Sequence, residues 1–393
     1  MVTPTEDGIS QFISKDFQYL TQQNKIQYKG INLKCTYLIN IIHELLVKYY
    51  FSNNLEIKFN LSSTILRKKY GEYYNYYINY LCENGFMSLV SKYYVGKKTN
   101  PYKLDTKYVY DVVRWKSYDK FILKKCKNRY ETSITEMTQN LICIDVKKRL
   151  VESLNKIQID YEGAMNFLTT LKNNDLIEDS KYFSNLLSVD NISLNNIYFN
   201  FDDFGRFHTN YTILKKEIRN SYLTINNEIL TEIDIKNSQP LFFAALLKEE
   251  LTIINKDTQK YFDLVKAGLL YDDIVENSDV ETRNDAKELI YKVLFGRNRE
   301  TKKENKIFKK LYPSIYEYIL EFKDLRDNYK ELSHELQKME SQFIYNKVIK
   351  EIYDTYPNIV LFTIHDSIMF PMSYKEKIET IFNKHFQDLI KNI

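Results

Sequence analysis

Two aspartates of this chain have the type and setting of metal ligands. Asp234 follows the β-prone segment "LTEI" and precedes an apolar helical run, and Asp366 lies at the turn of "VLFTIHDSIMFP", between two β-prone runs. Two converging carboxylates repel each other unless cations lie between them, so the pair predicts a site for two Mg²⁺ ions, with Mn²⁺ as an alternative. Metal ions held in this way clamp the attacking and leaving oxygens of a phosphoryl transfer.

A basic and aromatic helix face lies between the two aspartates in the sequence. In "ETRNDAKELIYKVLFGRNRE" the residues Arg283, Lys287, Tyr291 and Phe295 are four positions apart and therefore share one face of a helix, which Gly296 closes. Two cations followed by two aromatic rings suit a nucleoside triphosphate, with its phosphates along the cations and its sugar and base against the rings.

Further polar residues surround these segments. The turn "NFDDFGRFHTN" projects Arg206 and His208, and Ser238 with Gln239 begins the helical run after Asp234. We expect His365 to lie at the site and to shape the Asp366 turn, rather than to act as an acid or base.

The three segments, in this order, resemble the three polymerase motifs shared by family A DNA polymerases and the single-subunit phage-type RNA polymerases. Asp234 matches the metal-binding aspartate of the first motif. "RNDAKELIYKVLFG" keeps the Arg-x3-Lys-x7-Tyr-Gly spacing of the second motif, with Phe295 in the Tyr position, and "IHDS" around Asp366 matches the His-Asp core of the third. Gly205-Arg206 also resembles the Gly-Arg that precedes the first motif in many family A enzymes. The resemblance implies that Arg206, Ser238 and Gln239 contact the substrate. The resemblance covers about residues 200 to 375.

The resemblance implies an α+β, predominantly helical, right-hand fold: a palm with an antiparallel sheet that bears both aspartates, and helical fingers and thumb. Asp234 and Asp366 would hold the metals while a 3′ hydroxyl attacks the α-phosphate, and Lys287 would stabilise charge on the leaving pyrophosphate. Arg283 would bind the outer phosphates. Tyr291 would lie beside the sugar, and Phe295 near the templating base.

Departures from the family pattern bear on the sugar of the substrate. The first motif lacks the Glu with which many family A DNA polymerases exclude a ribose 2′ hydroxyl, and the spacing from Asp234 to Ser238 is that of the RNA polymerase branch. Phe295, in contrast, lacks the hydroxyl with which the RNA polymerase Tyr selects ribose. We expect a minimal DNA polymerase. Two alternatives stay open: an RNA-synthesising primase or small single-subunit RNA polymerase, and a non-catalytic DNA-binding replication initiator.

Residues 61–104 resemble a winged helix-turn-helix domain. A Ser N-cap, two helical patterns broken at Gly71, a turn at Asn84-Gly85, a β-prone run and a short closing strand follow one another. Residues 73–84 would then be the recognition helix and 96–101 a basic wing. The expected DNA-binding residues are Lys68, Lys69, Lys97 and Lys98. The alternative is a protein-docking module, because winged helices also serve that role.

The pattern divides the chain into a winged-helix-like nucleic-acid-binding region (1–105), a helical connector or thumb-like region (106–198), and a palm and fingers catalytic core (199–393). We expect no proofreading exonuclease, because this length leaves no room for one. A polymerase of this small size is typical of a mobile element such as a phage or plasmid. The expected partners are a primer-template or DNA template and nucleoside triphosphates.

Composition sets the remaining bounds. The 393 residues include 56 Lys and Arg against 52 Asp and Glu, so a nucleic-acid surface must come from local clustering of cations. The four cysteines are far apart in the sequence and support neither a zinc site nor a disulfide framework. The sequence shows no signal segment and no apolar run of membrane-spanning length, so we expect a cytoplasmic protein, in the host cytoplasm if a phage or plasmid encodes it, without a membrane partner.

Overall fold

A computed structural model describes residues 8–52, 57–91, 100–120, 122–124, 127, 134–135, 137, 141–297, 302–325 and 328–393. The fold is α+β and predominantly helical, with small antiparallel sheets, which confirms the predicted fold class at this level. The chain forms two compact units. Unit 1 comprises 1–132, 158–198 and 213–223, and unit 2 comprises 133–157, 199–212 and 224–393.

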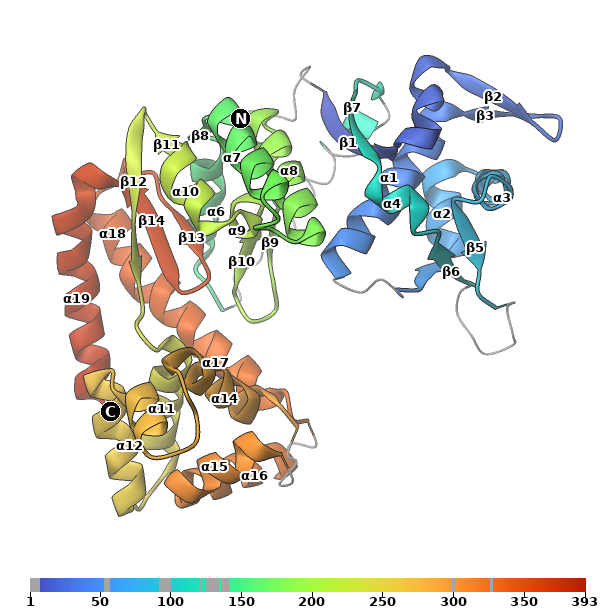
Figure 1. The fold of residues 1–393 in the computed structure, drawn as a ribbon. Helices are drawn as coiled ribbons and strands as arrows, with labels where there is room; N and C mark the ends of the chain where they lie inside the picture. The colour runs from blue at the N-terminus through green and yellow to red at the C-terminus, as the bar shows by residue number, and fades with distance from the viewer. Residues whose placement is uncertain are drawn as a thin grey trace. The chain divides into compact units, whose positions relative to one another are not determined.

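Unit 1 is built from short strands and a set of helices (Figure 1). Its strands are β1 (Ile9–Ser14), β2 (Lys25–Tyr28), β3 (Ile31–Lys34), β4 (Phe59–Leu61), β5 (Met87–Leu89), β6 (Asn100–Leu104) and β7 (Val112–Ser117). Its helices are the 3₁₀ helix η1 (Lys15–Gln22), α1 (Cys35–Ser52), α2 (Ser63–Tyr70), α3 (Tyr74–Glu83), α4 (Lys107–Tyr110), α7 (Tyr161–Asn173), α8 (Asp179–Ser193) and α10 (Lys216–Tyr222).

Helices α2 and α3 begin and end where the sequence predicts. The side chain of Ser62 accepts from the backbone N–H of Ile65 and caps α2, which ends at Gly71 with φ 82°. Helix α3 ends at Asn84, and Gly85 has φ 76°. Strands β4, β5 and β6 form an antiparallel sheet in the order β4-β6-β5. Most of the predicted wing lies outside the described residues, and Lys97 and Lys98 lie there with it.

The predicted helical region 106–198 is shared between the two units and also contains strands. Strand β7 pairs antiparallel with β1 over its full length, from Ile9 opposite Ser117 to Ser14 opposite Val112. Strand β8 (Ile157–Ile159) separates α6 (Ile144–Leu154) from α7. The sequence pattern hides these strands because they are short, and β7 pairs with a strand near the other end of unit 1.

Unit 2 contains the segments that carry the three motifs. Its strands are β9 (Phe199–Phe201), β10 (Phe207–Thr209), β11 (Leu223–Ile225), β12 (Glu228–Asp234), β13 (Phe362–Ile364) and β14 (Ser367–Pro371). Its helices, besides α6, are α9 (Asn210–Ile213), α11 (Ser238–Glu250), α12 (Lys256–Ala267), α13 (Leu270–Glu276), α14 (Arg283–Phe295), α15 (Lys303–Leu311), α16 (Pro313–Leu325), α17 (Glu331–Ser341), η2 (Gln342–Ile349), α18 (Lys350–Thr355), the 3₁₀ helix η3 (Met372–Tyr374) and α19 (Lys375–Lys391).

In unit 2 the strands β13, β14, β12 and β11 are neighbours in this order, and each neighbouring pair is antiparallel. Every residue of β13 and β14 is buried. A strand that is buried on both faces needs apolar residues without alternation, which explains the continuous β-prone runs on both sides of Asp366.

Two helical features frame the sheet. Helix α11 is buried from Ser238 to Leu247 without interruption, so it is a core helix with no solvent face over that stretch. Helices α17 and α18 are joined by η2, a π-helical segment of eight residues. Such segments are rare and are often found at functional sites, and this one follows directly after Glu340 and Ser341.

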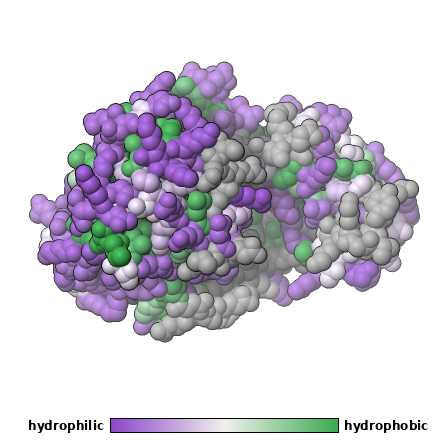
Figure 2. Space-filling model, turned by 90° about the horizontal axis from the view of Figure 1, so that it is seen from below, coloured by the Kyte–Doolittle hydropathy of each residue, from purple (hydrophilic) through white to green (hydrophobic). Residues whose placement is uncertain are grey.

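The surface seen in Figure 2 is mostly hydrophilic, with hydrophobic residues in small separate areas. Exposed large hydrophobic side chains of the described residues are distributed over several elements, among them Ile65, Tyr73, Leu176, Ile229 and Ile253. Within the described part of the chain, no helix is both long enough and apolar enough to cross a bilayer.

Candidate active site

Strand register brings the two aspartates to the same end of the sheet. Asp234 is the last residue of β12 and lies opposite Ser367, the first residue of β14. Ile364 of β13 also pairs with Ser367, so His365 and Asp366 form a two-residue turn directly beside Asp234. His365 adopts the left-handed conformation, φ 56°, which such tight turns require. The predicted convergence of Asp234 and Asp366 is therefore present in unit 2.

The electrostatics of Asp366 reflect this convergence. Burial, and next the nearby carboxylates of Glu340 and Asp234, raise the pKa of Asp366 to about 7, while Arg206 acts in the opposite direction. Accumulated negative charge at one point makes ionisation costly and favours a cation. The described residues contain no group of three or more His, Cys, Asp or Glu side chains arranged to hold a metal ion. Mg²⁺, however, commonly takes one or two carboxylates and completes its shell with water and phosphate oxygens, so two aspartates fit it.

Helix α14 carries the predicted basic and aromatic face as one continuous row. Lys287 Nζ lies 5.8 Å from the ring centre of Tyr291, and the rings of Tyr291 and Phe295 stack at 5.4 Å. Burial, and then the charges of Asp366 and Glu340, raise the pKa of Tyr291, so this residue of the row lies within electrostatic range of the carboxylates. The ammonium of Lys287 is solvent-exposed, and no ion pair to it is recorded among the described residues.

Both ends of α14 are fixed. At the N-terminal end, Arg283 Nη2 donates to the Gly268 carbonyl (3.2 Å), and its guanidinium lies 5.8 Å from the Tyr271 ring. At the C-terminal end, Lys323 of α16 donates to the carbonyls of Val293 (2.7 Å) and Gly296 (2.8 Å). Lys323 is 3% exposed, and burial lowers its pKa to about 8. The positions of Tyr291 and Phe295 thus depend on a buried lysine from another helix.

Glu340 is the centre of a buried polar cluster next to the aspartates. Its Oε1 accepts from Arg206 Nη2 (2.9 Å), and its Oε2 accepts from Ser238 Oγ (2.6 Å) and from Gln239 Nε2. Glu340 is 2% exposed, so its oxygens are satisfied by these donors rather than by water. We call these four residues the Glu340 cluster. Arg206, Ser238 and Gln239, expected to contact the substrate, are therefore engaged with Glu340 in this structure.

The turn that carries Arg206 is tightly built. Asp202 Oδ1 accepts from the backbone N–H groups of Phe204 (3.0 Å) and Arg206 (2.9 Å). Gly205 has φ +85°, and a Cβ there would lie 2.8 Å from Leu141 Cδ2 and 2.9 Å from Ser341 Cβ. Only glycine fits both the backbone conformation and the close approach of the residue that follows Glu340.

His208 lies close to the Asp366 turn. Its Nε2 is 2.9 Å from Asp202 Oδ2, and its ring centre is 5.9 Å from that of His365. Burial opposes ionisation of Asp202, but hydrogen bonds from His208 and from two backbone N–H groups hold its pKa below the ordinary value. An ionised Asp202 fixes the Arg206 turn, and His208 links this turn to the hairpin that carries Asp366.

Lys68 and Lys69, the described lysines that are expected to bind DNA, differ from each other in their surroundings. Lys68 is exposed, whereas Lys69 forms an ion pair with Glu44 at 2.7 Å. Helix α3, the expected recognition helix, contains no Lys or Arg and exposes Tyr73 at its start. Electrostatic attraction to DNA from this helix itself is therefore weak.

Sequence reasoning placed the aspartates and the α14 face but missed the importance of Glu340 and Lys323. Glu340 lies outside the three motifs, and the structure buries it beside them. A signal existed in "KMESQFIYN", where a carboxylate stands within an otherwise apolar and small helix face. No sequence pattern points to Lys323, because its partners are backbone carbonyls, which every residue carries.

The chain matches no protein-family model, and no curated protein matches its sequence.

Proposed function

We propose that unit 2 is the catalytic core of a template-directed nucleotidyltransferase, a minimal DNA polymerase that extends a 3′ hydroxyl. The observation that carries the proposal is the juxtaposition of Asp234 and Asp366 at one end of an antiparallel sheet, close enough to Tyr291, on the helix that also bears Lys287, for their charges to raise its pKa. In the right-hand architecture that we propose, this sheet is the palm and α14 belongs to the fingers.

The side chains of α14 suit the triphosphate. The Arg283 guanidinium, held beside Tyr271, would bind the outer phosphates, and the exposed ammonium of Lys287 would stabilise charge on the leaving pyrophosphate. The stacked rings of Tyr291 and Phe295 offer a flat apolar surface to the sugar and base. Holding both reactants in line is the main contribution that a protein makes to phosphoryl transfer.

Asp234 and Asp366 would hold the metal. Mg²⁺ bound there would supply charge neutralisation at the transferring phosphoryl group. Glu340 would act on the site indirectly, by fixing Arg206 and the start of α11.

The two residues that could select a ribonucleotide offer it no hydroxyl donor. Ser238, at the position that leans toward the RNA polymerase branch, donates its hydroxyl to Glu340, and Phe295 offers no hydroxyl to a ribose. A site that does not hydrogen-bond a 2′ hydroxyl gains nothing from its presence.

We propose that unit 1 contributes nucleic-acid binding. The order α1-β4-α2-α3-β5-β6 with an antiparallel β4-β6-β5 sheet supports a winged-helix-like region. This observation also favours the second candidate function, a DNA-binding replication initiator without catalysis.

Extension of a labelled primer on a DNA template with Mg²⁺ tests the proposal, with dNTPs and NTPs in separate reactions beside Asp366→Ala. Incorporation of dNTPs that is lost in Asp366→Ala supports the DNA polymerase, and incorporation of NTPs alone supports the RNA-synthesising alternative. Tight duplex binding without incorporation of either would contradict the polymerase and leave the initiator.

A further inference from the structure

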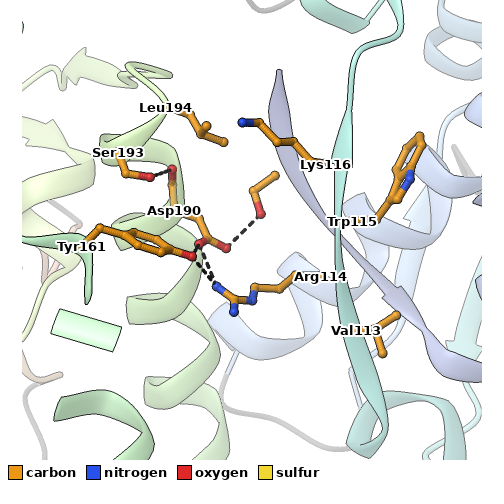
Figure 3. Close-up of a pocket in the computed structure, with 9 residues that line it drawn as sticks. Val113, Arg114, Trp115, Lys116, Tyr161, Asp190, Ser193 and Leu194 are labelled. Carbon is orange, nitrogen blue, oxygen red and sulfur yellow. Dashed lines mark hydrogen bonds and ion pairs between the residues drawn. The ribbon is translucent and has the colours of Figure 1, made fainter. Parts of the chain in front are cut away.

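A pocket of about 610 Å³ in unit 1 lies outside the proposed active site. It is lined by residues of β1, β7, α7 and the end of α8 (Figure 3). Arg114 and Lys116 extend from β7 toward α7 and α8, whereas Val113 and Trp115 lie on the other side of the strand. The pocket therefore presents two cations from one face of one strand.

A buried carboxylate anchors this pocket. Asp190 of α8 is 4% exposed, and its Oδ2 accepts from Ser10 Oγ (2.9 Å). Its Oδ1 accepts from the Tyr161 hydroxyl (2.9 Å) and from Arg114 Nη1 (2.9 Å). With donors from three elements, Asp190 is satisfied without a further cation.

Arg114 uses only part of its guanidinium for this anchoring. The bonds recorded for it within the described residues all start at Nη1, which donates to Tyr161, to Asp190 and, at 3.8 Å, to Met165 Sδ. The group is thus held by one nitrogen, while Nε and Nη2 keep their donors for another partner, and the side chain is 41% exposed. A guanidinium fixed in this way loses little conformational entropy when it binds an oxyanion bidentately.

Lys116 supplies the second cation. Its recorded contact within the described part of the chain is the ring of Tyr118, 5.6 Å from Nζ, and it has no acidic partner there. Residues two apart on a strand project from the same face about 6.6 Å from each other, which is comparable with the separation of consecutive phosphates along a nucleic-acid strand. Several other cations of unit 1 are paired with acids, among them Lys29, Arg67 and Lys69.

We propose that Arg114 and Lys116 bind consecutive phosphates of a nucleic-acid strand, at a site of unit 1 separate from the winged-helix-like segment. This inference rests on the proposed function for the class of ligand. It assigns the backbone contact to β7, where cations are available, rather than to α3, which has none.

Binding of a labelled single-stranded oligonucleotide to the full chain, followed by anisotropy over a range of salt concentrations, tests the site. Lys116→Gln should weaken binding about fivefold. The plot of log K against log salt, which has a negative slope, should become less steep by about one. Arg114→Lys keeps the charge and the partner of Asp190, so it should weaken binding with little change of slope. Lys25→Gln, an exposed lysine on the β2-β3 hairpin, is the matched control and should bind as wild type.

Trp115, the only tryptophan of the chain, lies on β7 between Arg114 and Lys116 with its ring on the opposite side of the strand, so its emission reports indirectly on a ligand bound at these two residues. The oligonucleotide should change this emission in the wild type and change it less in Lys116→Gln. Wild-type affinity and slope in both variants would overturn the inference, and so would an emission change with inorganic phosphate or a dNTP alone that matches the change with the oligonucleotide. If primer extension fails but Lys116→Gln still weakens strand binding, the proposed function fails and this site stands.

Discussion

Replacement of Glu340 is expected to destabilise unit 2 because the carboxylate is buried at 2% exposure and accepts from three side chains. Removal of one partner from a buried ion pair costs about 3–5 kcal/mol. Arg206 is 24% exposed, so water relieves part of the loss, and we expect about 3 kcal/mol for Glu340→Ala. Glu340→Gln keeps the volume and one acceptor oxygen, and should cost about 1–2 kcal/mol.

The unfolding of unit 2 in these variants is measured by differential scanning calorimetry. Fluorescence is unsuitable, because the single tryptophan, Trp115, lies in unit 1. At about 2–4 °C per kcal/mol for a domain of this size, Glu340→Ala should lower the Tm of unit 2 by about 6–12 °C. The control is Glu335→Ala on the same helix, whose partly exposed pair with Lys338 is worth at most about 1 kcal/mol. Equal Tm values for Glu340→Ala and Glu335→Ala would refute the argument that the Glu340 cluster holds the site together.

Three further predictions follow from individual contacts. Lys287→Met should lower the rate of nucleotide incorporation about 10²-fold at unchanged Tm. The control Lys292→Met changes a lysine of the same helix that is paired with Glu304, and its rate should stay within about twofold of the wild-type rate. Equal rates for the two variants would contradict the role of Lys287. Gly205→Ala should cost about 2–4 kcal/mol in chemical denaturation, and Gly71→Ala, also at positive φ but with open space around it, clearly less. Burial lowers the pKa of Lys323 from 10.5 to about 8, so the unfolded chain binds more protons than the native chain between these values. Wild-type stability should therefore rise relative to Lys323→Met as pH increases through this interval, by at most about 1.4 kcal/mol per pH unit, and parallel urea-denaturation profiles for the two proteins would show that Lys323 does not titrate there.

Features with local causes could be predicted from the sequence. The ends of α2 and α3 follow from a Ser N-cap, from Gly71 and from the Asn84-Gly85 turn. The row from Arg283 to Phe295 follows from helical periodicity alone. The hairpin at Asp366 follows from two β-prone runs around a short polar turn.

Features that depend on contacts between distant parts of the chain could not be predicted from the sequence. Strand β7 was hidden in a pattern interpreted as helical, because its partner β1 lies about a hundred residues earlier in the chain. The Glu340 cluster joins a turn, the start of α11 and the end of α17, and no spacing rule connects them. The π-helical turn after Ser341 likewise depends on tertiary packing around it and has no local signature.

Single-turnover extension of a DNA primer by Asp366→Asn, beside Asp354→Asn as a surface control, tests the central claim most directly. Asp354 lies on α18 and pairs only with Lys350 among the contacts recorded for the described residues, so its change removes an equal charge away from the sheet end. The account predicts dNTP incorporation by the wild type and by Asp354→Asn and a loss of at least about 10³-fold in Asp366→Asn. Incorporation by Asp366→Asn at the wild-type rate would contradict it.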